Sequence, residues 1–265
     1  MLQTRIIPCL LLKDDSLVKT VNFKKPSYIG DPVNTARIFN ELEVDELAVL
    51  DITATNNKKS PNFKILSELA NECFMPLAYG GGIRTFEDAK KMFQIGIEKV
   101  IINTIAFEKP EFITQLASHF GNQAIVASID VKKNVFGKYQ VFSNSGKKKQ
   151  KVNIIDWAKK LEQLGAGEIL LTAIHQEGTW KGFDIELVES ITNAVDVPVI
   201  GKFIKDLGPE TANGGCANLK DIGAVVKKGN ASAVSLGSMV VYQNKGMGVL
   251  VNFPDNEKLK KVLNG

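Results

Sequence analysis

The sequence predicts an α/β protein folded as a (β/α)8 (TIM) barrel, and three observations support this fold class. Short apolar runs alternate with amphipathic stretches along the whole chain. Continuous apolar strands are typical of a parallel sheet that helices cover on both faces. The length of 265 residues suits one eight-stranded barrel. Two segments also match each other, which indicates a barrel built from two similar halves.

The expected elements alternate, with a helix after each strand. The candidate strands are 5–12, 46–52, 76–80, 99–103, 124–130, 168–174, 197–201 and 232–236. The candidate helices are 31–42, 60–73, 85–95, 109–119, 153–164, 184–194, 218–228 and 255–263. These pairs take up most of the chain, so we expect a single barrel domain over residues 1–265.

Two stretches interrupt the alternation. VKKNVFGKYQVFSNSG, which follows Asp130, alternates in the manner of a two-stranded hairpin turning near FGK. We expect it to be a β-hairpin insertion after the fifth strand, over the face where the strands end. KFIKDLGPETANGG (202–215) is longer than an ordinary strand-to-helix loop. A lid and an extra short helix are the alternatives there.

The composition is that of an ordinary globular protein, with 44% hydrophobic residues, 23% charged residues and a formal net charge of +4. The dense basic run KKKQK (147–151) is either a solvated loop or a loop that attracts anions. The sequence contains no nucleic-acid-binding module, and no apolar run approaches the 18 residues of a membrane span. We therefore expect neither a nucleic acid nor a membrane as partner.

The cysteines and histidines are few and scattered. Cys9, Cys73 and Cys216 lie far apart and form no CxxC pair, which favours a reducing compartment, the cytoplasm by default. His119 and His175 are too few for a zinc site. We expect neither a metal nor a cofactor.

The matching segments are GGIRTFEDAKKMFQIGIEKVIINTI (81–105, the first unit) and GGCANLKDIGAVVKKGNASAVSLGS (214–238, the second unit). They align without a gap. The identical positions include Gly81 with Gly214, Gly82 with Gly215, Asp88 with Asp221, and Gly96 with Gly229. Each unit starts with a glycine pair and continues through a helix into a strand.

A glycine pair lets the backbone approach a ligand closely, and the helix that follows offers N–H groups to an anion. The strand of the first unit ends in Asn103 and Thr104, and that of the second ends in Gly237 and Ser238. These residue types suit phosphate oxygens. We therefore expect two phosphate sites, around Gly82 and Gly215, on opposite sides of one barrel mouth. Purely structural turns are the alternative.

Two carboxylates end predicted strands at the rim where barrel enzymes hold their catalytic groups. Asp130 is the only charge to emerge from the buried run VASI, which favours an acid–base or substrate-binding role. Asp51 ends the second strand and is a weaker candidate for substrate binding. Either aspartate could instead cap the turn that follows it.

The chain resembles the cyclase subunit of imidazole glycerol phosphate synthase. RIIPCL, LVKTVNF, GDPV, ELAVLDIT, GGGIR, NQAIVASID, GAGEILLT and GTWKGFD follow the family's order, over about residues 1 to 240. The resemblance implies a barrel of two halves that binds a substrate with a phosphate at each end. It also implies a heterodimer with a glutaminase, whose ammonia crosses the barrel, and it places Gly178 among the phosphate-binding residues.

The family uses two catalytic aspartates, and this chain has one of them. Asp130 matches the aspartate of the fifth strand, whereas Leu11 occupies the position of the one on the first strand. Leucine cannot transfer a proton, and loss of one acid–base group typically costs on the order of 10²–10⁴ in rate. Further departures follow the sixth strand, where the family has acidic residues and this chain reads His175 and Glu177.

The entrance of the barrel resembles the family more closely. Its charged ring matches Arg5, Glu46, Lys99 and Glu168. Alternating charges could form an ammonia gate or simply a stabilising ring of ion pairs. Retention of the ring without the first carboxylate favours a role as an ammonia conduit.

The tail VVYQNKGMGVLVNFP resembles a subgroup associated with surface-polysaccharide (lipopolysaccharide) gene sets. That resemblance implies ammonia delivery to a separate enzyme that amidates an acetamido sugar. The alternatives are a cyclase of histidine biosynthesis that tolerates Leu11, and a non-catalytic scaffold that activates its glutaminase.

Overall fold

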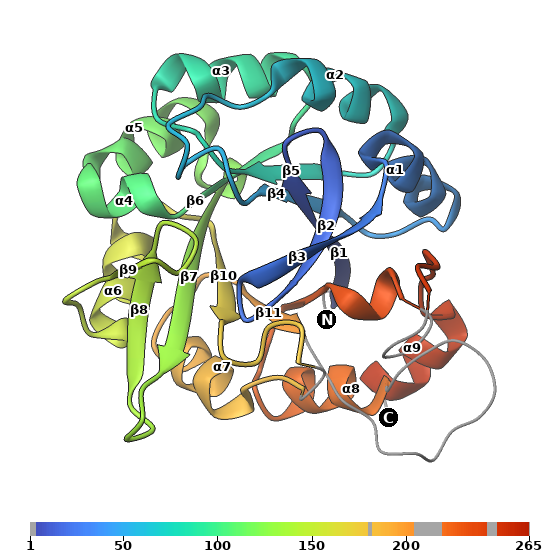
Figure 1. The fold of residues 1–265 in the computed structure, drawn as a ribbon. Coiled ribbons are helices and arrows are strands. Elements are labelled where there is room, and N and C mark those ends of the chain that lie inside the picture. Colours follow the sequence, from blue (N-terminus) through green and yellow to red (C-terminus); the bar gives the residue numbers. More distant parts are fainter. Residues whose placement is uncertain (1–3, 180–181, 204–218, 243–247, 265) are drawn as a thin grey trace.

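A computed structural model describes residues 4–179, 182–203, 219–242 and 248–264 of the chain. The eight expected strands form a closed parallel barrel, as the sequence predicted, with helices between the strands around its outside (Figure 1). In order around the barrel the strands are β1 (Arg5–Lys13), β4 (Leu47–Asp51), β5 (Leu77–Gly80), β6 (Lys99–Ile102), β7 (Ile125–Lys133), β10 (Glu168–Ala173), β11 (Val199–Phe203) and β12 (Ala233–Leu236). Parallel pairing of β12 with β1 closes the barrel.

The helices follow the predicted order with ends shifted by a few residues. They are α1 (Pro32–Glu41), α2 (Phe63–Glu72), α3 (Phe86–Gln94), α5 (Glu111–Phe120), α6 (Ile154–Gln163), α7 (Ile185–Thr192), α8 (Leu219–Lys227) and α9 (Asn256–Asn264). A short helix that the sequence analysis did not predict, α4 (Thr104–Glu108), begins directly after β6.

Local sequence signals explain where several helices begin. Asp31 accepts a hydrogen bond from the Asn34 N–H, and Pro32 fills the first position of α1. At α3, Thr85 and Asp88 form a reciprocal capping box. Among the described residues, no helix is long and apolar enough to cross a membrane.

Two β-hairpins extend from the strand ends. The predicted insertion is present: β7 runs beyond the barrel and pairs with antiparallel β8 (Tyr139–Ser143), which pairs with β9 (Lys148–Lys149). The other hairpin, β2 (Ser16–Val21) and β3 (Lys24–Gly30), was not predicted from the sequence and lies over the mouth of the barrel (Figure 1). Nearly all of the irregular stretch 202–215 lies outside the described residues.

The apolar core has two parts. The larger packs the outer face of the sheet against the helices. The smaller lies inside the barrel and consists of Ile7, Cys9, Ala48, Ala78, Ile101, Val126, Leu170, Ile200 and Ala233. Because side chains alternate along a strand, each strand sends every second residue into this lumen. The residues below and above the inner core therefore form the floor and the mouth of the barrel.

Candidate active site and barrel floor

A cavity of about 600 Å³ opens at the mouth, where the strands end. Its lining includes Leu11 from β1, Asp51 from β4, Asp130 from β7 and Lys202 from β11. The turn of the β7–β8–β9 insertion contributes Asn144, Ser145 and Lys147. The structure therefore brings strand ends from around the barrel to one concave site, which is where barrel enzymes bind substrates.

Asp130 is buried in this site and 8% exposed. Asn103 donates a hydrogen bond from Nδ2 to Asp130 Oδ2, at 3.2 Å. Burial raises the pKa of Asp130 to about 7, although the Lys202 ammonium and a hydrogen bond with Thr172 act in the opposite direction. A carboxyl group that titrates near neutral pH can act as an acid or a base.

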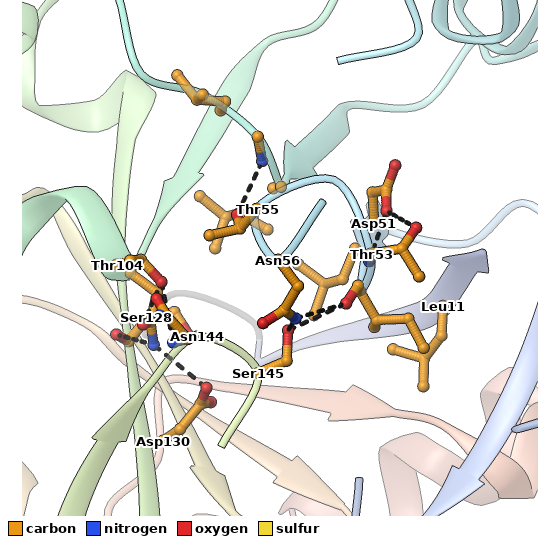
Figure 2. Close-up of a pocket in the computed structure, with 18 of the residues that line it drawn as sticks. Leu11, Asp51, Thr53, Thr55, Asn56, Thr104, Ser128, Asp130, Asn144 and Ser145 are labelled. Atoms are coloured by element: carbon orange, nitrogen blue, oxygen red, sulfur yellow. Dashed lines mark hydrogen bonds between the residues drawn. The ribbon is translucent and has the colours of Figure 1, made fainter. Parts of the chain in front are cut away.

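Leu11 faces the same cavity from β1 (Figure 2). Its side chain is 3% exposed, and its neighbour in the adjacent strand is Leu50. Leu11 therefore contributes an apolar wall to the cavity. The Leu11 side chain itself carries no group that can donate or accept a proton.

Asp51 and the glycines of the first unit pack tightly at the ends of β4 and β5. Asp51 Oδ1 accepts hydrogen bonds from Thr53 N, Thr53 Oγ1 and Ala54 N, at 2.8–2.9 Å (Figure 2). A Cβ atom on Gly81 would lie 2.5 Å from Asp51 O, and one on Gly82 would lie 2.8 Å from Lys59 O. Both glycines also have positive φ angles. Gly82 N donates to Thr55 Oγ1 at 3.1 Å, so this backbone already belongs to a bonded turn.

Asn103 and Thr104 line the same cavity as Gly82. Thr104 Oγ1 accepts a hydrogen bond from Asn144 N at 3.0 Å, which ties the insertion to α4. Arg84 also lines the cavity and donates from Nη2 to Thr55 O. The first unit thus places an amide, a hydroxyl and a guanidinium group around one side of the mouth.

The second half of the barrel is arranged differently. A Cβ atom on Gly178 would lie 2.1 Å from the carbonyl oxygen of Thr20, in the β2–β3 hairpin. A Cβ atom on Gly237 would lie 3.0 Å from Lys19 Nζ. Ser238 begins a short 3-10 helix and is buried. Gly215 lies outside the described residues.

Sequence reasoning did not assign roles to Lys19 and Lys202, two buried lysines at the mouth. Lys19 Nζ donates to the carbonyl oxygen of Cys9 at 3.0 Å, and burial lowers the pKa of Lys19 to about 8. Burial also acts to lower the pKa of Lys202, but nearby acceptors, including Glu177 and Asp130, outweigh it and raise that pKa. The alternation of VIGKF, in which Ile200 faces the lumen, was the signal that Lys202 would face it too.

Glu177 and His175 have separate partners. Glu177 is 4% exposed and accepts hydrogen bonds from Thr20 Oγ1 at 2.9 Å and Phe23 N at 3.0 Å, both in the hairpin. His175 lies 3.3 Å from Asp184, which also contacts Lys133 and Tyr139 near the turn of the β7–β8 hairpin. Burial lowers the pKa of His175 despite this carboxylate.

The four charged residues of the predicted ring meet at the opposite end of the barrel. Arg5 contacts Glu46 at 2.6 Å and Glu168 at 2.8 Å. Lys99 contacts the same two carboxylates at 2.8 Å and 3.2 Å. Each cation therefore bridges both anions in a closed ring. Burial acts to lower the pKa of Arg5, but attraction by Glu168 and Glu46 outweighs it and raises that pKa.

A narrow cavity of about 10 Å³ lies inside the barrel above this ring. Its lining combines Glu46 from the ring with inner-core residues such as Ile7, Ile101 and Ile200. A cavity of this size has room for about one water-sized molecule. The barrel axis thus runs from a charged floor through an apolar interior to the polar mouth.

The chain is a (β/α)8 barrel with a polar cavity at its mouth and a charged ring at its floor, and comparison with known proteins shows the family to which it belongs. The chain belongs to the histidine biosynthesis protein family, whose model matches residues 5–246.

Its relatives include HisF subunits and HisF paralogues. "Putative imidazole glycerol phosphate synthase subunit hisF2" of Pseudomonas aeruginosa is 47% identical, over 98% of this chain and 99% of that protein. A similarly named hisF3 protein of Vibrio vulnificus is 42% identical, over 99% of this chain and 97% of its own. The imidazole glycerol phosphate synthase subunit HisF of Alkaliphilus metalliredigens is 39% identical, over 91% and 92% respectively.

Proposed function

We propose that this chain is the ammonia-conducting subunit of a glutamine amidotransferase complex. A glutaminase would dock at the barrel floor and release ammonia there. The ammonia would pass the ring of Arg5, Glu46, Lys99 and Glu168, cross the apolar interior and emerge at the mouth. The relatives that are HisF subunits support this general role, because each is one part of a synthase.

One observation supports the proposal: the ring of ion pairs at the barrel floor is closed and mostly buried, beneath an apolar interior. Both cations bridge both carboxylates, and Glu46 has a side chain only 3% exposed. An ion-pair arrangement of this kind contributes little net stability compared with apolar residues. Its presence beneath an apolar lumen therefore favours a gate over a purely structural role.

The same mouth argues against efficient cyclase chemistry. Asp130 retains a pKa near neutrality, but Leu11 offers no partner group for proton transfer. We infer that the phosphorylated ligand of this mouth is held near Gly82, Asn103 and Thr104. Asp51, Gly178, Gly215, Gly237 and Ser238 complete the proposed ligand-binding set.

We further propose that the delivered ammonia serves the amidation of an acetamido sugar by a separate enzyme. The support is the resemblance of the tail to the polysaccharide-associated subgroup, together with Leu11. Cyclase function in histidine biosynthesis and a non-catalytic scaffold remain the competing assignments.

The test supplies the complex with the histidine-pathway ribonucleotide and an ammonium salt. Turnover should be undetectable or at least about a hundredfold below that of a normal cyclase, since one acid–base group typically contributes 10²–10⁴ in rate. Turnover in the normal range would restore the histidine assignment. A complex that hydrolyses glutamine without delivering ammonia would favour the scaffold.

A further inference from the structure

The narrow cavity inside the barrel has a hydroxyl group in its wall. Ser235 of β12 lines this cavity together with Glu46 and the aliphatic side chains of the inner core. Because side chains alternate along a strand, Ser235 faces the lumen, as Ala233 does two residues earlier. In the described lining, Ser235 and Glu46 are the polar residues, and all the others are apolar.

The Ser235 hydroxyl is buried and unpaired. The residue is 1% exposed, and within the described part of the chain its Oγ has no hydrogen-bond partner. Buried polar side-chain atoms are nearly always hydrogen-bonded, because an unsatisfied one costs the full desolvation penalty of the group. An unpaired hydroxyl in the wall of a cavity therefore indicates a site for a small molecule that can form hydrogen bonds.

The strand register places Ser235 between the inner cavity and the mouth. Its Cα partners in the adjacent strands are Ile7 of β1 and Lys202 of β11. Ile7 lines the inner cavity with Ser235, whereas Lys202 lines the cavity at the mouth. The hydroxyl thus lies on the side of the inner cavity that leads to the mouth, and Glu46 belongs to the ring at the floor.

The size and the walls of the inner cavity restrict what can bind there. About 10 Å³ admits one molecule of the size of water or ammonia. A buried water typically makes about three hydrogen bonds, and this lining offers only one hydroxyl and one carboxylate. An ammonium ion is disfavoured, because the walls are apolar and Glu46 already pairs with Arg5 and Lys99. Neutral ammonia has a lone pair that can accept a hydrogen bond from a serine hydroxyl.

We propose that Ser235 forms a binding station for one neutral ammonia molecule inside the barrel, where its hydroxyl donates a hydrogen bond to the ammonia nitrogen. The inference rests on the proposed role of the chain as an ammonia conduit and names a residue on the route. Ammonia that leaves the floor meets aliphatic side chains, and a polar molecule loses free energy in such surroundings unless it finds a hydrogen-bond partner. Ser235 supplies that partner before the ammonia reaches the mouth.

The direct test is methyl NMR of the full chain with ¹³C-labelled isoleucine. Ile7, Ile101 and Ile200 line the inner cavity, so their methyl signals report what enters it. Ammonium chloride is compared with sodium chloride at equal ionic strength, at pH 6 and at pH 9.5. At pH 9.5, where much of the ammonium is deprotonated, these signals should shift in proportion to the ammonia concentration. At pH 6 the two salts should give the same spectrum, and methylammonium chloride, whose amine is too large for the cavity, should act as sodium chloride does at both pH values.

Matched variants test the hydroxyl itself. Ser235→Ala should reduce the slope of the ammonia-dependent shifts about fivefold, the factor that one neutral hydrogen bond typically contributes. The control Ser118→Ala removes an exposed hydroxyl on α5 that donates to Thr114 O, and it should leave the slope unchanged. Equal slopes in Ser235→Ala and the native chain, or equal shifts with methylammonium, would overturn the inference. So would the absence of any ammonia-dependent shift at pH 9.5, which would mean that the cavity admits water only.

A second measurement separates this inference from the proposed function. The NMR titration uses no glutaminase, so its outcome does not depend on conduction in a complex. In the complete complex, Ser235→Val fills the cavity and should lower amination from glutamine at least fivefold, while amination from external ammonium changes less than twofold. A native complex that transfers no glutamine nitrogen would contradict the proposed function. Normal transfer in both the native complex and Ser235→Val would contradict the station at Ser235 alone.

Discussion

Replacement of Lys99 by methionine should destabilise the barrel through the charges that it leaves behind. Lys99 Nζ lies 2.8 Å from Glu46 and 3.2 Å from Glu168, and its side chain is 15% exposed. Without it, two poorly hydrated carboxylates share Arg5 alone. Loss of one partner from a buried ion pair costs about 3–5 kcal/mol, and the remaining Arg5 contacts favour the lower end.

A loss of about 3 kcal/mol corresponds to a fall in Tm of about 6–12 °C for a chain of this size. Thermal and urea denaturation measure it. The matched control is Lys260→Met, whose ion pair with Glu257 is exposed and should contribute almost nothing. If Lys99→Met were no less stable than Lys260→Met, the ring would not be the buried, mutually compensated cluster described above.

Three further predictions concern the mouth. The folded-state pKa of Asp130, about 7, lies above the ordinary aspartate value, so the contribution of Asp130 to stability falls as the pH rises from about 4 to 7. Asp130→Asn should therefore increase the free energy of unfolding more at pH 8 than at pH 5. Urea denaturation at both pH values measures this, and a larger increase at pH 5 would contradict the prediction. Glu177→Ala should speed amide hydrogen exchange in residues 16–30, because it removes both side-chain hydrogen bonds from Glu177 to the hairpin, whereas Glu186→Ala, at an exposed side chain, should not. Leu11→Asp should lower the Tm, since it buries a carboxylate in place of an apolar side chain that is 3% exposed, and a Tm equal to that of the native chain would mean that this wall is hydrated.

The barrel could be predicted from the sequence because its strands are continuous apolar runs separated by amphipathic helices. The ring could be predicted from family resemblance, and the structure brings Arg5, Glu46, Lys99 and Glu168 together. These features depend on local pattern and on the regular geometry of the barrel.

The missed features have weak local signals or depend on contacts between distant segments. SLVKTV alternates only briefly, and its pairing with KKPSYIG contains register irregularities, so the β2–β3 hairpin gives a weak signal. The contacts of Lys19 with Cys9 and of Glu177 with Thr20 join residues 10 and 157 positions apart. No local pattern encodes the contact between Glu177 and Thr20, which fixes the hairpin over the mouth.

The central claim is that ammonia travels through the barrel from the floor to the mouth. The most direct measurement supplies the complete complex with glutamine labelled with ¹⁵N in its amide, in the presence of equimolar unlabelled ammonium, and determines the ¹⁵N content of the aminated product by mass spectrometry. Conduction predicts product nitrogen derived almost entirely from glutamine with the native chain, and a fall toward the bulk isotope ratio with Lys99→Met. Product from the native chain that already carries the bulk ratio would contradict the account.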